Sequence, residues 1–235
     1  MGLKPDEKAK LVFTHDEMER FSPFLATDAT LDKQAQDFAK KILFQTVNAL
    51  SLMLAERDPY TYHHQERMAK IAEAIAIEIG LSEAKVSIIK MAAKVHDIGK
   101  IRIPIEILCK SGQIDEFEFG IIKTHPQVGF DILNNIEFPW PIAQIVLQHR
   151  ERLNGSGYPH GLRGEHILLE ARVLAVADVV EAMASHRPYR PALGVAAALN
   201  EISQNRDVLY DALAVDGCMN LSRKMDFANE DSYFA

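Results

Sequence analysis

The sequence predicts an all-α protein whose helices surround a metal centre in the core. Apolar residues recur at helical spacing along most of the chain, and no stretch alternates apolar and polar residues as strands do. Histidine and aspartate side chains fall on the inward faces of several predicted helices. Together these two observations place the chemistry inside a helical bundle, preceded by an N-terminal connector helix.

Composition and charge exclude several classes of protein. The 235 residues can hold one sizeable domain and an appendage. The net charge of -7 argues against binding to a nucleic-acid polymer, which usually requires a basic face. Two cysteines are too few for a disulfide framework and favour a reducing cytoplasm. No apolar run approaches the length of a membrane span, and residues 1–5 show no signal-peptide core, so we expect no membrane insertion.

A first long helix is expected over residues 31–56, after an N-terminal stretch of weak periodicity. Its apolar stripe comprises Phe38, Ile42, Leu43, Val47, Leu50 and Leu54. Two interpretations stay open: a packing helix of the same domain, or a connector from a sensory or signalling domain that also provides a homodimer surface. We divide the chain into an N-terminal segment with a connector helix, residues 1–55, and a catalytic domain, residues 56–235.

A second helix is predicted over residues 61–79, after the break at Asp58-Pro59. Its core stripe of Met68, Ile71 and Ile75 extends back by one turn to His64. His64 therefore faces inward. A single inward histidine is more often a core residue than a ligand, so His64 alone does not identify a site.

The third predicted helix begins after Ser82, a good N-cap, and leads through an apolar stretch into His96 and Asp97. We expect Gly99 to end this helix in a left-handed conformation, which puts both metal-competent side chains in the last turn. Lys100 follows at once and suits a phosphate oxygen. The alternative for Lys100 is a cation favoured by the helix dipole.

Two further histidines and a glycine-rich loop follow a loop predicted over residues 101–113. A helix over residues 115–124 is bent or ended by His125-Pro126. A later helix opens near Pro141, and its apolar stripe points at His149. Residues 154–161 then form a glycine-dense loop that includes Tyr158, for which a simple tight turn is the alternative.

A helix over residues 167–185 is apolar on nearly every side and should be buried. Asp178 sits in its middle, and a buried carboxylate is costly unless it is paired or binds a metal. The alternative is a salt bridge to an arginine such as Arg172. We favour the metal because histidines on other helices have the same inward placement. Two more helices are expected over residues 195–204 and 210–225.

These inward donors form a set suited to metal-dependent phosphodiester cleavage. The candidates are His64, His96, Asp97, His125, His149 and Asp178. Four imidazoles and two carboxylates suit iron, manganese, nickel or zinc rather than calcium. Six donors are too many for one open catalytic ion and suit two ions, a common arrangement for phosphodiester hydrolysis. Lys100 is placed to stabilise the negative charge that develops on the phosphate during the reaction.

The ordered motifs between Asp58 and Pro191 resemble those of the HD-GYP domain, a branch of the HD phosphohydrolases. Its two signatures are present as His96-Asp97-Ile98-Gly99-Lys100 and Gly157-Tyr158-Pro159. The resemblance implies an HD-type helical bundle with a centre of two or three metal ions, often iron. It also implies hydrolysis of the bacterial second messenger cyclic di-GMP to linear pGpG, in some members onward to GMP.

The resemblance also implies roles for individual residues. The same six residues become the metal ligands, with Asp97 as the bridge. Lys100, Arg187 and Arg190 become substrate-binding cations, for which a surface or salt-bridging role is the alternative for both arginines. Tyr158 belongs to the loop that flanks the pocket.

Three departures from the family pattern change the expected site. Arg150 replaces a second histidine and Tyr60 replaces a glutamate, and both losses remove ligands of a third metal. We therefore expect two metals, with Arg150 placing its charge on the substrate side where the third ion would sit. Asn154 replaces an aspartate and alters loop docking or partner recognition. Two alternatives stay open: a degenerate domain that binds the dinucleotide or a protein without turnover, and a hydrolase for another cyclic dinucleotide or nucleotide.

Overall fold

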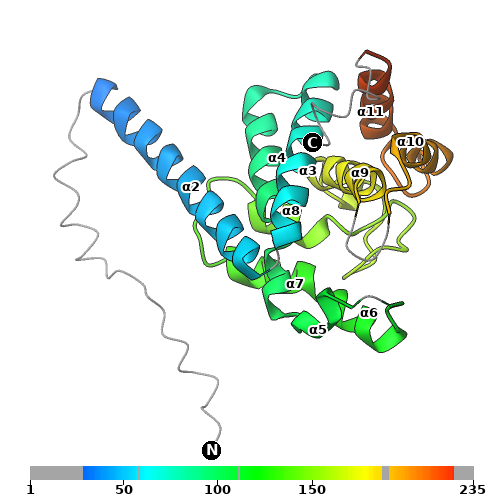
Figure 1. Cartoon of the computed structure of the whole chain (residues 1–235). Coiled ribbons are helices and arrows are strands. Elements are labelled where there is room, and N and C mark those ends of the chain that lie inside the picture. The colour runs from blue at the N-terminus through cyan, green and yellow to red at the C-terminus, as the bar shows by residue number, and fades with distance from the viewer. Residues whose placement is uncertain (1–28, 58, 111, 187–190, 225–235) are drawn as a thin grey trace, which may run out of the picture. The chain divides into compact units, whose positions relative to one another are not determined.

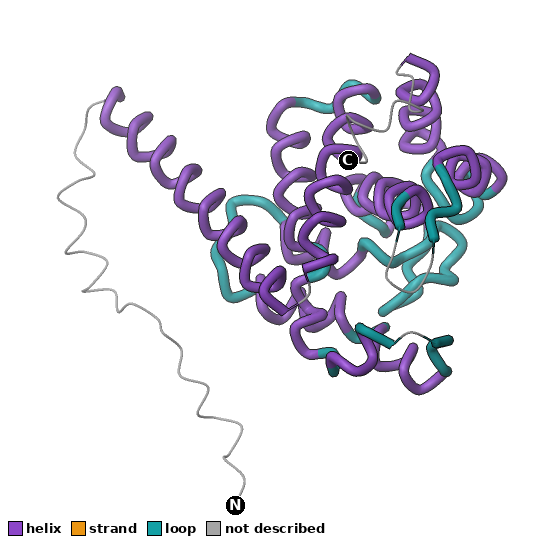
Figure 2. Tube along the Cα trace, viewed as in Figure 1, coloured by secondary structure: helices purple, strands orange, loops and turns teal. Residues whose placement is uncertain are grey.

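The computed structural model describes residues 29–57, 59–110, 112–186 and 191–224, and the regular elements within these ranges are all helices (Figures 1 and 2). This confirms the prediction of an all-α protein. The chain divides into two units, residues 1–43 and residues 44–235. The elements are α2 (Ala29–Arg57), α3 (Pro59–Glu78), α4 (Glu83–Val95), η2 (Ile98–Arg102), α5 (Ile105–Leu108), α6 (Glu116–Ile122), α7 (His125–Leu133), α8 (Ile142–Gln148), η3 (Gly164–His166), α9 (Leu169–Ala184), α10 (Val195–Gln204) and α11 (Ala212–Lys224).

Four helices of the second unit form the bundle that carries most of the candidate ligands. Helix α3 packs on α4 and α9, α4 also contacts α8 and α9, and α8 contacts α9. Figure 1 shows α3, α4 and α9 side by side. The fully buried side chains of Ile75, Ile89, Ile145 and Leu174 come one from each of these helices. Helices α10 and α11 pack against α9 and α3.

Gly99 has a different role from the one predicted. Its φ is not positive, and the chain does not turn left-handed there. Helix α4 ends at Val95 with His96 as its C-cap, and η2 follows. Helix α7 packs on η2, and a Cβ at Gly99 would overlap the backbone carbonyl of His125 and approach Gly129 N to 2.6 Å. Glycine is needed here for a close backbone contact that puts the His96-Asp97 corner against α7.

The other elements agree with the predictions to within a few residues, with one correction. The predicted loop over residues 101–113 contains α5. The predicted break at His125-Pro126 is present, but α6 already ends at Ile122 and His125 is the first residue of α7. The capping box at the start of α6 joins Asp115 and Glu118 reciprocally. Ser82 caps α4 as expected, with its side chain accepting from the backbone N–H of Lys85.

Helix α2 contributes part of the core of the second unit. Val47 and Leu54 are 0% and 1% exposed, and Ser51 donates a hydrogen bond to Gln65 on α3 (2.8 Å). The N-terminal features before residue 29 lie outside the described residues. None of the described helices combines the length and the apolar character that a membrane crossing needs.

Candidate metal centre

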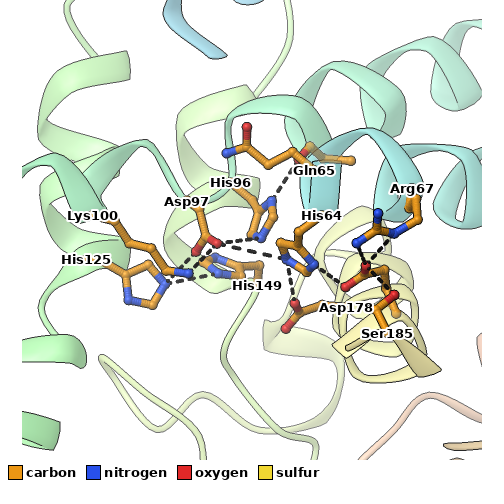
Figure 3. A network of polar contacts seen from close by, with 12 residues as sticks. His64, Gln65, Arg67, His96, Asp97, Lys100, His125, His149, Asp178 and Ser185 are labelled. Atoms are coloured by element: carbon orange, nitrogen blue, oxygen red, sulfur yellow. Dashed lines mark hydrogen bonds and ion pairs between the residues drawn. The ribbon is translucent and has the colours of Figure 1, made fainter. Parts of the chain in front are cut away.

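The structure brings six predicted side chains together where helices of the second unit meet (Figure 3). Each comes from a different element or from a junction between two elements, and all six are buried. They are His64 on α3, His96 and Asp97 after α4, His125 at the start of α7, His149 after α8, and Asp178 in the middle of α9. Residues that are up to about half of the chain length apart in the sequence therefore share one site.

Three of the histidines are oriented by helix ends. Each places Nδ1 against the backbone carbonyl three residues earlier, in the last turn of α4, α6 or α8. The pairs are His96 with Ala93 (2.7 Å), His125 with Ile122 (2.7 Å) and His149 with Val146 (2.6 Å). Carbonyls in the last turn of a helix lack a partner within the helix. Because a carbonyl can only accept, Nδ1 carries the proton and Nε2 keeps its lone pair facing the site.

His64 is oriented by a carboxylate instead. Its Nδ1 hydrogen-bonds to Glu181 Oε2 across the α3–α9 interface. Glu181 Oε1 accepts from Arg67 Nε and from Ser185 Oγ, both at 2.8 Å. Burial would lower the pKa of His64, but Asp178 and Glu181 raise it overall. Glu181 is absent from the residues predicted for the site, although a second carboxylate one turn after Asp178 in a buried helix is a signal for it.

One group of donors lies between α3, α4 and α9. Ligand atoms of His64, His96 and Asp178 all lie within 4.8 Å of one another. His64 Nε2 is 3.3 Å from Asp178 Oδ1. These three side chains can therefore reach a common ion.

Asp97 lies between this group and the remaining histidines. His96 Nε2 is 3.3 Å from its Oδ2, and His125 Nε2 is 3.4 Å from its Oδ1. Lys100 Nζ forms an ion pair with Oδ2 at 2.6 Å. A second group within 4.8 Å contains His96, Asp97 and His149, and His125 Nε2 is 3.3 Å from His149 Nε2. The central position of Asp97 is the one that a bridging ligand would need.

Four ligand atoms in this site make no hydrogen bond of good geometry with any residue that the structure describes, although one of them, Asp97 Oδ2, has the ion pair with Lys100. They are His96 Nε2, both Asp97 oxygens and Asp178 Oδ1. A buried polar atom without a hydrogen bond costs about 1–3 kcal/mol. Imidazole nitrogen and carboxylate oxygen are ligands of first-row divalent metals. The donor set therefore fits a divalent metal ion, which would satisfy these atoms.

The charge states of His125, His149 and Asp97 also suit metal binding, which requires neutral imidazoles and ionised carboxylates. Burial, opposed by Asp97 and reinforced by Arg150 and Lys100, lowers the pKa of His125 to about 3. Burial and Arg150 hold the pKa of His149 well below its usual value. Burial would raise the pKa of Asp97, but His96 and Lys100 bring it well below the ordinary range.

Arg150 is the cationic partner of Asp178. One of its terminal nitrogens lies 2.5 Å from Asp178 Oδ2, and its Nε donates to His149 Nε2 at 3.2 Å. The arginine considered in the sequence analysis, Arg172, instead pairs with Asp211 at 2.6 Å. Arg150 thus holds one oxygen of Asp178 and leaves the other for the site.

The glycine-rich loop borders the centre through Tyr158. The centroid of its ring lies 6.3 Å from that of His125. The buried carboxylate of Glu151 accepts from the backbone N–H of His160 (2.8 Å) and of Leu162 (3.0 Å). Glu151 therefore fixes the loop that carries Tyr158.

Some predicted residues are not tested by these contacts. Arg187 and Arg190 lie outside the described residues, and so does the side chain of Tyr60. Asn154 accepts from Ser156 N at 3.0 Å, which shapes the start of the glycine-rich loop.

The family model that matches this chain describes an HD domain and covers residues 48–213. The chain is 44% identical over 177 residues to the cyclic di-GMP phosphodiesterase response regulator RpfG of Xanthomonas campestris, covering 74% of this chain and 47% of that protein. It is 38% identical over 200 residues to a cyclic di-GMP phosphodiesterase of Thermotoga maritima, covering 83% and 54%. A 3'3'-cGAMP-specific phosphodiesterase of Vibrio cholerae, number 3, is 33% identical over 165 residues, covering 70% and 36%. The chain spans about half the length of the first two of these relatives.

Solved structures show the same fold. An HDG"Y"P protein of Bdellovibrio bacteriovorus, Bd1817, superposes with a TM-score of 0.59 at 17% identity, covering 81% of this chain and 64% of that one. A cyclic GMP-AMP phosphodiesterase of V. cholerae gives a TM-score of 0.57 at 19% identity, covering 80% and 49%. These likenesses confirm the HD-type helical bundle.

Proposed function

The chain belongs to the HD domain family, in its HD-GYP branch, and from this we propose that it is a metal-dependent phosphodiesterase that hydrolyses cyclic di-GMP to linear pGpG. Further hydrolysis to GMP is the second step of this proposal. The main observation in support is that six buried donor side chains converge on one site. Four of their ligand atoms make no hydrogen bond of good geometry with the described residues. The relatives named cyclic di-GMP phosphodiesterases support the substrate.

Two divalent ions suit this donor set, with iron the first candidate and manganese, nickel or zinc as alternatives. The proposed ligands are the six residues of the centre, with Asp97 between the two ions. When bound, the ions would activate a water molecule and neutralise the charge that develops on the phosphate. The chain itself supplies neutral imidazoles whose Nε2 atoms are already turned inward.

Fixed cations of the chain are proposed to bind the substrate phosphates. Lys100 lies at the edge of the site and forms an ion pair with Asp97, and Arg150 forms an ion pair with Asp178. Both side chains are partly exposed, at 18% and 20%, so they border both the buried donors and solvent. In this proposal Lys100 assists the reaction, Arg150 occupies the place of a third ion, and Arg187 and Arg190 add phosphate contacts.

Two other functions have specific support. Relatives specific for 3'3'-cGAMP are 32–34% identical to this chain, which supports a mixed cyclic dinucleotide as substrate. Arg150 occupies atoms of two candidate ligands, Asp178 and His149. That contact supports a domain that binds a dinucleotide without turnover, in which the arginine competes with metal.

One experiment separates these functions. Protein purified anaerobically would be assayed on cyclic di-GMP, 3'3'-cGAMP and cyclic di-AMP, with metals quantified on the same sample. We expect about two metals per chain and preferred turnover of cyclic di-GMP, both reduced in Asp97→Ala. The control is Asp131→Ala, which removes an exposed carboxylate of α7.

The remaining outcomes lead to different conclusions. Preferred turnover of 3'3'-cGAMP would change the substrate and keep the reaction. Bound metal and bound dinucleotide without turnover would establish the receptor function. A metal content unaffected by Asp97→Ala would show that the proposed ligands are wrong. Light scattering on the same sample tests whether the chain forms the homodimer that one interpretation of the first long helix allows.

A further inference from the structure

An aromatic side chain on α6 lies next to the candidate centre and has no role in the bundle core. Helix α6 buries none of its residues. The Phe119 side chain is 44% exposed, yet its ring centroid lies 6.4 Å from that of Tyr158. Tyr158 in turn lies 6.3 Å from the ring of His125. Two successive ring contacts thus lead from a candidate metal ligand to an exposed phenylalanine.

We propose that Phe119 and Tyr158 form the surface that receives a purine base of the substrate. This inference rests on the proposed function and deepens it by assigning base recognition to named residues. The two ring planes meet at 83°. Two perpendicular aromatic surfaces let a flat base stack on one ring while its edge meets the other. Aromatic side chains are effective partners for bases because every base has a π-face.

The position of this surface fits a nucleotide whose phosphate is at the metal centre. In a cyclic dinucleotide, one sugar lies between each base and its phosphate. In the protein, one aromatic ring, that of Tyr158, lies between Phe119 and the candidate metal ligand His125, so the two separations are of similar size. Lys123 Nζ lies over one face of the Phe119 ring, 4.7 Å from its centroid, so in this proposal the base uses the opposite face.

A neighbouring residue offers a matched control. Phe117 lies on the same short helix and is 88% exposed, and the aromatic contact of α6 with Tyr158 runs through Phe119. Phe119→Ala removes the ring, whereas Phe119→Leu keeps apolar bulk beside Tyr158 and removes the π-face. Phe117→Ala removes an equal ring from the same helix.

The test measures KM and kcat for the cyclic dinucleotide that the protein hydrolyses, together with metal content and Tm. Stacking on an aromatic side chain corresponds to a roughly 5- to 150-fold change in binding. We therefore expect KM to rise at least about fivefold in Phe119→Ala and in Phe119→Leu. The change in kcat should be smaller, metal content should be unchanged, and Phe117→Ala should behave like the wild-type protein.

Each result has a defined meaning. Equal KM values in the Phe119 and Phe117 variants, with normal hydrolysis by the wild-type protein, would overturn the base surface and leave the proposed function standing. So would a KM effect of Phe119→Ala that Phe119→Leu restores, since packing alone would then explain it. If the wild-type protein hydrolyses nothing, calorimetric titration with cyclic di-GMP replaces the assay. Weaker binding in both Phe119 variants would then support the surface without the reaction, and no binding by the wild-type protein would overturn both.

Discussion

Replacing Glu181 by glutamine should weaken metal binding by roughly 10- to 100-fold while leaving the fold intact. The carboxylate is 0% exposed, and all three of its side-chain partners are donors. Oε1 accepts from Arg67 and Ser185, and Oε2 accepts from His64. A glutamine keeps one acceptor oxygen and puts an NH2 group in place of the other. One donor partner must then face another donor.

Either orientation of the glutamine disturbs the site. If the NH2 faces Arg67, a partly buried guanidinium loses its acceptor. If it faces His64, Nδ1 must accept, so the ring proton moves to Nε2 and blocks the atom that faces the metal. Outer partners of metal-binding histidines typically contribute a factor of 10 to 100 in affinity, which corresponds to about 1.4–2.7 kcal/mol.

The assay is competition with a chelator for Mn²⁺, which gives the metal dissociation constant of each variant. Glu170→Gln is the matched control, because Glu170 lies on the same helix and pairs at the surface with Lys85 at 3.2 Å. Surface pairs contribute about 0–1 kcal/mol, and this one is remote from the centre. NMR of the imidazole nitrogens reports directly on which nitrogen of His64 carries the proton. Equal dissociation constants for Glu181→Gln and Glu170→Gln would refute the positioning role.

Three further predictions follow from the same contacts. Gly99→Ala should lower the free energy of unfolding by about 3 kcal/mol, seen as a Tm decrease of roughly 6–12 °C, because the new Cβ would meet the backbone of α7. The control is Gly120→Ala: Gly120 has open space around it, so this change should raise the free energy of unfolding by up to about 1 kcal/mol. Arg150→Ala should destabilise metal-free protein by up to about 3–5 kcal/mol in chemical denaturation, since it removes the arginine partner of a buried carboxylate and leaves His64 as its nearby cation. The loss should shrink with saturating Mn²⁺, and an equal loss with metal would contradict this. At pH 6.5 metal binding should release about one proton per chain, because the raised pKa of His64 keeps that ring protonated before binding, while the pKa of His125, about 3, keeps the His125 ring neutral. Calorimetry in two buffers of different ionisation enthalpy counts the released protons, and release of three or more would refute the assignment.

Local pattern was sufficient to predict where the site residues would point. The stripe of Met68, Ile71 and Ile75 turned His64 inward, and the uniformly apolar helix around Asp178 identified a buried carboxylate. Helix periodicity determines which face is buried, and in a small bundle the buried faces meet. The convergence of these residues was therefore predictable even though no spacing in the sequence encodes a distance.

Contacts between distant elements could not be predicted in this way. Gly99 was read as a helix stop, whereas its function depends on the approach of α7, which no local pattern contains. The partner of Asp178 was sought along its own helix at Arg172, but it came from Arg150 after α8. Glu181 was overlooked because its importance comes from His64, over a hundred residues away in the chain.

Three histidines are hydrogen-bonded to carbonyls in the last turns of three helices, so the lengths of those helices determine where each imidazole meets the candidate metal centre. One residue inserted into α4, α6 or α8 would rotate the following histidine by about 100° and advance it by about 1.5 Å. The imidazole would then face a neighbouring helix or solvent instead of the candidate metal centre. Insertions and deletions should be tolerated instead in loops that do not set the position of a histidine, such as residues 112–114 and 134–137. Libraries of length variants selected for metal content would show whether the chain accepts changes in size only at such joints.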